Sequence, residues 1–199
     1  MTVLTLILAS TSVYRKELLT RLRYPFETVA PAVDEAALPA ETPSVMALRL
    51  AQAKARDVAG RYPEAVVIGS DQVADLQGQV LGKPLTHNKA VAQLQALSGQ
   101  TATFYTAVCV MCLNTGFIES ATVVTRVSFQ LLTLQDIKRY LSLEPALDCA
   151  GSAKCEGLGI TLMRSIEGDD PTALIGLPLI RTTELLRQIG LDPLKDPLA

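Results

Sequence analysis

Short apolar runs alternate with segments of helical periodicity in the first half of the chain. Residues 2–9 form a continuous apolar run that predicts a buried strand. Ser12 then offers an N-cap for a helix whose core-facing positions are Leu18, Leu19 and Leu22. A strand, a hydroxyl-rich turn and a helix start favour an anion site, because unpaired backbone N–H groups and the positive end of the helix dipole converge there.

A proline-rich stretch separates this unit from a second one of the same kind. Residues 24–43 predict extended chain and loop. Thr42-Pro43 starts a helix with an apolar face over 45–58, and Gly60 is expected to end it. Residues 65–70 predict a second buried strand that places Asp71 and Gln72 at its carboxyl end, where ligands bind in open α/β sheets.

The second half of the chain predicts an antiparallel hairpin between further helices. Glycine and alternation signals predict a turn at 77–79 and two strands over 101–113 and 117–131. Capping residues predict a helix from Thr86 to Leu97, ended by Gly99, and another from a Thr133/Asp136 capping box to Leu143. A strand at 160–163, an acidic loop at 167–170 and a last helix at 178–189 are expected to follow. No repeat or long linker divides the chain. We therefore expect one α/β domain over residues 1–199, with helices flanking a mixed sheet and a cleft between two lobes.

Composition and charge narrow the classes of function. Of 199 residues, 49% are hydrophobic, which excludes a disordered chain. The 18 basic and 20 acidic residues give a net charge of −2, so no global positive field exists to hold a nucleic acid. The longest apolar run resembles neither a signal peptide nor a membrane span, and we expect a cytoplasmic protein without a nucleic-acid or membrane partner.

The cysteines and the histidine give little indication of a metal site, a redox motif or a catalytic triad. Cys109 and Cys112 form a C-x-x-C motif inside a predicted strand, where residues three apart face opposite sides and so do not share a metal. Ordinary buried thiols are the favoured interpretation for them and for Cys149 and Cys155. His87, the single histidine, stands at a predicted helix start and predicts a solvated residue rather than a member of a catalytic triad.

Charged residues at the ends of predicted elements are better candidates. Residues 78–83 do not form a P-loop, because three residues separate the glycines and Pro84 replaces the Ser/Thr. Arg15 and Lys16 oppose the dipole at a helix start, which an anion would relieve. Lys54 and Lys83 could join them, and the carboxylates of Asp34, Glu35 and Asp71 could hold a divalent cation or activate water. Solvated surface is the simpler interpretation for each, except for Asp71, which follows five apolar strand residues.

Several motifs together resemble one family. In order along the chain they are Leu6 to Ser12, Arg15 to Leu19, Val33-Asp34-Glu35, Leu48 to Lys54, Ile68 to Gln72, Gly82-Lys83-Pro84, Phe104-Tyr105-Thr106, Ala150-Gly151-Ser152 and Ile175 to Pro178. This series resembles the Maf family of nucleotide pyrophosphatases over nearly the whole chain, and implies a Maf/ITPase-like fold. The combination is highly specific, although each motif alone is weak.

The resemblance implies a metal-dependent enzyme that cuts a nucleoside triphosphate into the monophosphate and pyrophosphate, in a house-cleaning role. Asp71 is implied as the proton acceptor, with Glu35 its partner in handling water and a Mg²⁺ or Mn²⁺ ion. The implied phosphate-site residues are Ser10, Arg15, Lys16, Lys54 and Lys83. This set suits the reaction, because attack of water on phosphorus needs a base and cations that neutralise the phosphates.

Three positions bear on the base of the nucleotide. Tyr14, Gln72 and Glu156 resemble the branch of the family that acts on 7-methyl-GTP, which carries an aromatic residue, Gln and Glu, although Trp is the usual aromatic residue. An aromatic face stabilises the cationic methylated base by about 0.5–2 kcal/mol. A carboxylate can accept both hydrogen bonds from the donor edge of guanine, which a glutamine cannot do.

Two alternatives stay open: the dTTP/UTP branch of the same family, and a nucleotide-sensing regulator of cell division and septum formation. The resemblance alone implies a homodimer. The sequence leaves open the preferred metal, the cellular substrate and the role of Cys109 and Cys112.

Overall fold

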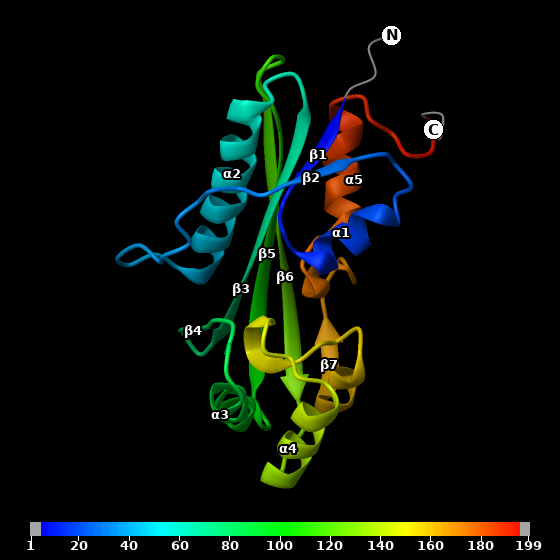
Figure 1. The fold of residues 1–199 in the computed structure, drawn as a ribbon. Coiled ribbons are helices and arrows are strands. Elements are labelled where there is room, and N and C mark those ends of the chain that lie inside the picture. The colour runs from blue at the N-terminus through cyan, green and yellow to red at the C-terminus, as the bar shows by residue number, and fades with distance from the viewer. Residues whose placement is uncertain (1–4, 196–199) are drawn as a thin grey trace. The chain divides into compact units, whose positions relative to one another are not determined.

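A seven-stranded mixed sheet with five α-helices forms the protein, which is described here from a computed structural model over residues 5–195 (Figure 1). The strand order is β2-β1-β3-β5-β6-β7, and β4 pairs with β3. The chain divides into two compact units. Unit 1 holds the residues up to Gln72, Thr106–Val123 and those from Asp170 onward, and unit 2 holds Val73–Tyr105 and Val124–Asp169.

Unit 1 contains the amino-terminal parallel part of the sheet. Its elements are β1 (Leu6–Ala9), α1 (Val13–Thr20), β2 (Glu27–Val29), α2 (Pro43–Arg61), the first part of β3 (Val66–Leu76), the end of β5 (Thr101–Cys112), the start of β6 (Phe117–Phe129), a 3₁₀ turn (Ala173–Ile175) and α5 (Leu179–Gln188). β1 lies between β2 and β3, runs parallel to both, and places Ala9 opposite Gly69. These pairs form the parallel part of the mixed sheet that the sequence predicted.

The two faces of the sheet in unit 1 carry different helices. Leu6 and Leu8 of β1, with Val66 and Ile68 of β3, belong to a core cluster that includes residues of α1 and α5. Because side chains alternate along a strand, Gly69 lies on the other face, directly under α2. Figure 1 shows α2 on one side of these strands and both α1 and α5 on the other.

Unit 2 contains antiparallel pairs and smaller helical segments. Its elements are the rest of β3, β5 and β6, together with β4 (Gln79–Leu81), α3 (His87–Leu97), α4 (Leu134–Leu143), β7 (Met163–Glu167) and 3₁₀ turns at Ala150–Ser152 and Leu158–Leu162. β3 and β4 pair antiparallel with Leu76 opposite Gln79, so the hairpin turn predicted at 77–79 is present, with Gln77 and Gly78 as its loop residues. β6 pairs antiparallel with β7.

Helix starts follow the sequence closely. The side chains of Ser12, Thr42, Thr86 and Thr133 cap α1, α2, α3 and α4, and Thr133 forms the predicted capping box with Asp136. The predicted stop at Gly60 is wrong, because α2 continues to Arg61. Gly60 is exposed and can adopt the helical conformation like any residue.

Three strand predictions need correction. β1 begins at Leu6 rather than Thr2, and residues 2–4 lie outside the described part of the chain. β3 does not end at Ser70 but runs on to Leu76, because β4 pairs with its continuation. The strand expected at 160–163 lies at Met163–Glu167, since Leu158–Leu162 coils into a 3₁₀ turn.

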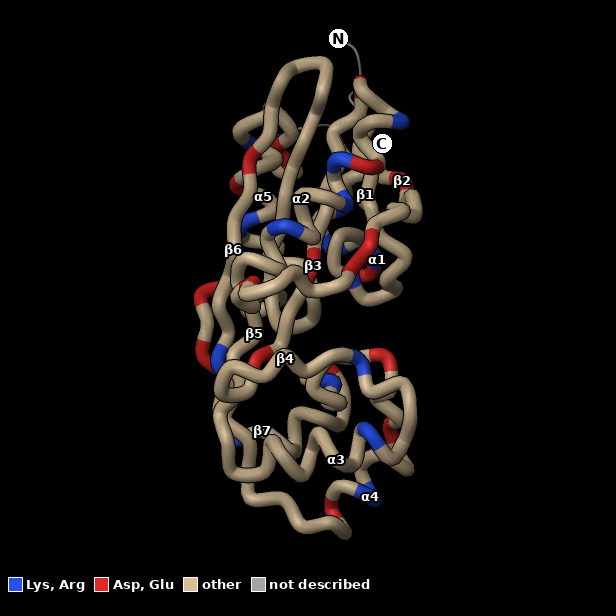
Figure 2. Tube along the Cα trace, turned by 90° about the vertical axis from the view of Figure 1, so that its left-hand side faces the viewer, with Lys and Arg blue, Asp and Glu red and all other residues tan. Residues whose placement is uncertain are grey.

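The structure also bears on the predictions for the cysteines, the charge distribution and membrane-spanning helices. All four cysteines are free thiols. Cys112 belongs to the cluster that includes α1 and α5, whereas Cys109 interacts with Ser120, which receives a hydrogen bond from Gln52 of α2. The two thiols therefore face opposite sides of β5, as predicted. Basic and acidic positions are interspersed along both units (Figure 2), and no helix over residues 5–195 is long and apolar enough to span a membrane.

Candidate active site in unit 1

A lysine lies between two carboxylates on the α2 side of β3. Lys54 Nζ is 2.6 Å from Oδ1 of Asp71 and 2.6 Å from Oε1 of Glu35. The side chains of Lys54 and Asp71 are only 7% and 10% exposed, while Glu35 is 60% exposed and faces the solvent. The structure thus brings together three residues that the sequence analysis assigned to catalysis, metal binding and phosphate binding.

Close packing between β3 and α2 creates this arrangement. A Cβ on Gly69 would collide with the carbonyl of Ala51 and would lie 2.6 Å from the backbone nitrogen of Ala55. Gly69 and Asp71 are two residues apart and so share one face of β3. Lys54, next to Ala55 on the buried side of α2, therefore reaches Asp71. Asp71 lies within β3 rather than at its end, but β1 has already ended opposite Gly69.

The turn between β1 and α1 carries further predicted residues. Ser10 is buried, and its Oγ accepts a hydrogen bond from the backbone N–H of Ser12. Ser12 in turn caps α1 by accepting from the Arg15 N–H. Arg15 Nε donates to the carbonyl of Gly176 at 2.8 Å. Burial lowers the pKa of Arg15, while the negative charges of Asp71 and Glu35 raise it, so these carboxylates and the guanidinium share one electrostatic environment.

Tyr14 and Lys16, the other two candidate residues in α1, differ in their exposure to solvent. Tyr14 is half-buried, whereas Lys16 is exposed on the first turn of α1. The assignments of Tyr14 to the base and Lys16 to the phosphates stay predictions.

Backbone carbonyls of the 173–176 segment orient the residues that follow Gly69. Gln72 Nε2 donates to Thr106 Oγ1, Ala173 O and Leu174 O at 2.9–3.0 Å. Ser70 Oγ lies within hydrogen-bond distance of the carbonyls of Ala107 and Gly176. Three acceptors around its nitrogen fix the amide of Gln72, so the amide atom that it can offer to another group is the oxygen, an acceptor.

Asp170 supports this segment, and sequence reasoning missed it by treating it as part of an acidic loop. Its side chain is buried and accepts hydrogen bonds from the backbone N–H and hydroxyl of Thr172 and from the backbone N–H groups of Ile180 and Arg181. The carboxylate thereby fixes the start of α5 and the segment that receives Arg15 and Gln72. The only signal in the sequence is an acidic residue before a helix, which also describes an exposed cap.

Lys83 and Glu156 belong to unit 2, and both are exposed. Lys83 follows Gly82, whose carbonyl accepts a hydrogen bond from Gln93 of α3. The same Gln93 side chain accepts from Ser152 Oγ at 2.6 Å, shortly before Glu156. One side chain of α3 thus ties together the two segments of unit 2 that carry predicted substrate residues.

The buried Tyr140 and the half-buried Glu144 fix the backbone around Glu156. Tyr140 donates to Glu144 Oε2 and accepts from the Lys154 N–H, and the same Glu144 oxygen accepts from the Gly159 N–H. Glu144 lies so close to Gly157 that a Cβ there would collide with its carboxylate. The backbone of residues 154–159 is therefore held rigidly, while the Glu156 side chain remains exposed.

The carboxylates of unit 1 fit a hard divalent cation that takes its remaining ligands from a phosphate and water. No group of three or more His, Cys, Asp or Glu side chains that could hold a metal ion occurs over residues 5–195. Mg²⁺ commonly uses only one or two carboxylates and completes its shell with substrate phosphates and water. The Glu35 and Asp71 oxygens that approach Lys54 show that a positive charge is already accommodated between these carboxylates.

Comparisons with known proteins find a family and relatives that match most of the chain. The family profile described as Maf-like protein matches residues 5–189. A protein of Polaromonas sp. (strain JS666 / ATCC BAA-500), named 7-methyl-GTP pyrophosphatase, is 60% identical over 185 residues, which cover 93% of this chain and 84% of that protein. Proteins with the same name from Xanthomonas campestris pv. campestris (strain 8004) and Nitrosococcus oceani are 60% and 55% identical, and the matches cover 93–94% of this chain and 94–96% of those proteins.

The profile match includes every residue that the sequence analysis selected for the site. The likeness also extends over nearly the whole length of relatives that share one name. The chain therefore belongs to the Maf family.

Proposed function

We propose that this protein is a metal-dependent pyrophosphatase that hydrolyses 7-methyl-GTP to 7-methyl-GMP and pyrophosphate. The observation that carries the proposal is the buried Lys54–Asp71 pair with Glu35 on its exposed side, in a chain 55–60% identical to relatives named for this reaction. Removing the charges of Lys54 and Asp71 from water costs free energy that their attraction does not clearly recover, so this buried ion pair is weak evidence of a stabilising role and supports a role in catalysis.

In the proposed reaction, Asp71 accepts a proton from a water molecule that attacks the α-phosphorus. The bond between this phosphorus and the oxygen bridging to the β-phosphorus breaks, and pyrophosphate leaves with the bond's electron pair. Lys54 and Arg15 stabilise the negative charge that develops on the phosphates. Ser10, Lys16 and Lys83 are assigned to the same phosphates by the family resemblance.

Glu35 and Asp71 are the residues that would hold the Mg²⁺ or Mn²⁺ ion. When bound, such an ion neutralises phosphate charge and lowers the pKa of coordinated water. Lys54 Nζ lies between the two carboxylates and holds them close together. We therefore expect chelation with EDTA to abolish turnover, and added Mg²⁺ or Mn²⁺ to restore it.

Selectivity for the methylated base is assigned to Tyr14, Gln72 and Glu156. The fixed amide of Gln72 supports this assignment, because its available oxygen is an acceptor and guanine presents N–H donors. The cationic ring of 7-methylguanine also suits an aromatic face such as that of Tyr14.

Asp71→Asn is the decisive test. The variant keeps the shape of the side chain but removes the proton acceptor, so we expect kcat to fall by roughly 10²–10⁴-fold. Asp192→Asn, which alters a carboxylate near the carboxyl terminus of unit 1, is the matched control and should keep wild-type turnover. Near-normal activity of Asp71→Asn would contradict the assignment.

The substrate is tested with a nucleotide panel that scores pyrophosphate against phosphate release. Preference for 7-methyl-GTP supports the proposal, and preference for dTTP or UTP places the chain in the other branch. No cleavage of any nucleotide with either metal would favour a nucleotide-sensing regulator, whose effect should survive Asp71→Asn.

A further inference from the structure

The loop of residues 30–41 carries Glu35 and lies along α2, to which it is tied at both ends. Near Ala30, Arg61 donates to the Ala30 carbonyl, and Asp57 accepts from the Ala32 N–H at 3.0 Å. Arg61 and Asp57 also pair with each other at 2.7 Å. The first tie therefore fixes the backbone of the loop before it reaches Glu35.

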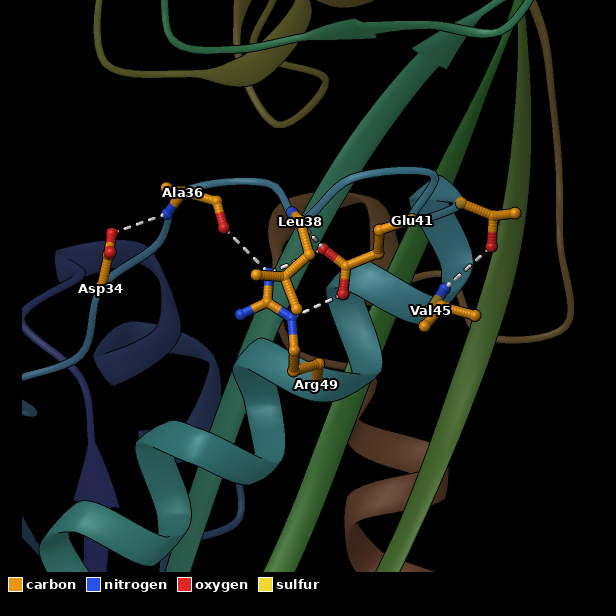
Figure 3. Close-up of polar contacts among 7 residues, drawn as sticks. Asp34, Ala36, Leu38, Glu41, Val45 and Arg49 are labelled. Carbon is orange, nitrogen blue, oxygen red and sulfur yellow. Dashed lines mark hydrogen bonds and ion pairs between the residues drawn. The ribbon is translucent and has the colours of Figure 1, made fainter.

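Arg49 makes the second tie, beyond Glu35 (Figure 3). Its Nε and Nη2 atoms donate to the two carboxylate oxygens of Glu41 at 2.5 and 2.7 Å. Nη2 also donates to the Ala36 carbonyl at 3.0 Å. Glu41 further accepts from the Leu38 N–H, so one guanidinium holds both the middle and the end of the loop.

Local bonds within the loop extend this tie towards Glu35. Asp34 Oδ1 accepts from the Ala36 N–H at 2.9 Å, as Figure 3 shows, so the backbone turns tightly around Glu35. Glu35 lies between Asp34 and Ala36, whose carbonyl accepts a hydrogen bond from Arg49. From this turn the Glu35 carboxylate reaches Lys54 of the same helix, at 2.6 Å.

α2 therefore carries both the partner of Glu35 and the residues that fix its loop. Arg49, Asp57 and Arg61 are spaced by multiples of four and form one stripe, which extends over about 18 Å of helix at 1.5 Å per residue. Glu35 has an exposed side chain, and without these ties its loop would sample many conformations.

We propose that Arg49 is a positioning residue for Glu35: its bidentate ion pair with Glu41 and its bond to Ala36 hold the loop so that the Glu35 carboxylate stays at the Lys54–Asp71 pair. The inference rests on the proposed function. Arg49 acts through Glu35 and touches no reacting atom. Displacement of a site group by about 1 Å can cost on the order of 10²-fold in rate, so the effect should be large.

The test is a double-mutant cycle with 7-methyl-GTP and Mg²⁺. Arg49→Met should lower kcat/KM about 10- to 100-fold, and Arg49→Lys should recover only part of this loss, because an ammonium cannot form the bidentate pair. In an Glu35→Gln background, Arg49→Met should change kcat/KM by less than about 2-fold, since the group that it positions is already lost. Arg181→Met, which removes the exposed pair with Glu184 on α5, is the matched control and should not alter activity in either background.

Hydrogen exchange at the Leu38 amide gives a readout that does not depend on turnover. Leu38 N–H donates to Glu41, which Arg49 holds, so its exchange should accelerate in Arg49→Met and not in Arg181→Met. If Arg49→Met does not fold, Arg49→Lys with the same exchange measurement replaces it.

Two results would overturn the inference alone: unchanged kcat/KM in Arg49→Met, or an equal fold-loss with and without the Glu35 carboxylate. An inactive wild-type protein would instead overturn the proposed function, so the two failures are distinguishable.

Discussion

Gly69 of β3 and Ala55 of α2 lie so close that a side chain on the glycine would be 2.6 Å from the Ala55 backbone nitrogen. This approach lets Lys54 reach Asp71, two residues farther along the strand. The Lys54–Asp71 pair thus depends on the absence of a methyl group at Gly69.

Gly69→Ala should therefore damage stability and activity together. The added Cβ must push α2 away from β3, which we expect to cost about 1–3 kcal/mol or more in the free energy of unfolding. It should also lower kcat/KM, because Lys54 moves with the helix. Urea unfolding and turnover of 7-methyl-GTP measure both effects.

Gly60→Ala is the control, since a Cβ at this exposed position on the same helix meets nothing within 4 Å. It should stabilise the protein by about 0.5–1 kcal/mol through helix propensity and leave turnover unchanged. Equal effects of the two substitutions would contradict the packing argument.

The ties of the 30–41 loop predict a loss of stability in acid. The Arg49 hydrogen bond lowers the pKa of Glu41, and the Ala32 N–H, followed by Arg61, lowers that of Asp57. A carboxylate with a depressed pKa stabilises the fold above its unfolded pKa of about 4, and this contribution disappears as the pH falls through the folded pKa.

We expect the urea midpoint to decrease as the pH falls below about 5, and Glu41→Gln to flatten part of that dependence. Urea unfolding of both proteins at several pH values provides the measurement. Parallel curves for wild type and Glu41→Gln would show that the pair does not contribute.

Glu156→Gln should reduce selectivity without abolishing hydrolysis. A glutamine cannot accept both hydrogen bonds from the guanine edge, so the ratio of kcat/KM for 7-methyl-GTP to that for UTP should fall about ten-fold, in line with about 1–3 kcal/mol for a bidentate contact. Glu119→Gln, an exposed change on β6, is the control. An unchanged ratio would remove Glu156 from the specificity set.

Cys155 should resist alkylation in the folded protein. Burial, followed by the neighbouring Glu156 charge, raises its pKa to about 12, so very little thiolate exists at pH 8. Iodoacetamide labelling followed by mass spectrometry should find Cys155 modified slowly in buffer and rapidly in urea. Rapid labelling of Cys155 in the folded state would contradict this environment.

Local chemistry explains which parts of the fold could be predicted. Caps such as Thr42 and Thr133 bond to backbone groups three residues away, so the sequence near them contains the whole interaction. Strand ends depend on distant partners: β3 continues past Ser70 because β4 returns to pair with it. The sequence predicts β7 a few residues too early because Arg164-Ser165-Ile166-Glu167 carries a weaker apolar signal than the preceding run.

The candidate site shows the same division. Asp71 stands out in the sequence because it follows an apolar strand, and the resemblance grouped it with Lys54 and Glu35. Nothing local indicates that Arg49 holds the Glu35 loop or that Asp170 fixes the segment facing Gln72. Both contacts are made with backbone groups, 13 residues away for Arg49 and 10 for Asp170, and such groups carry no sequence signature.

The carbonyls of residues 173–176 have a consequence for synthesis on the ribosome. Arg15, Ser70 and Gln72 all donate to this segment, which is translated about 100 residues or more after each of them. A nascent chain that lacked this segment would leave Arg15 without its Gly176 acceptor and Gln72 without two of its three acceptors, so nucleotide cleavage should begin only once residues 173–176 have emerged from the exit tunnel.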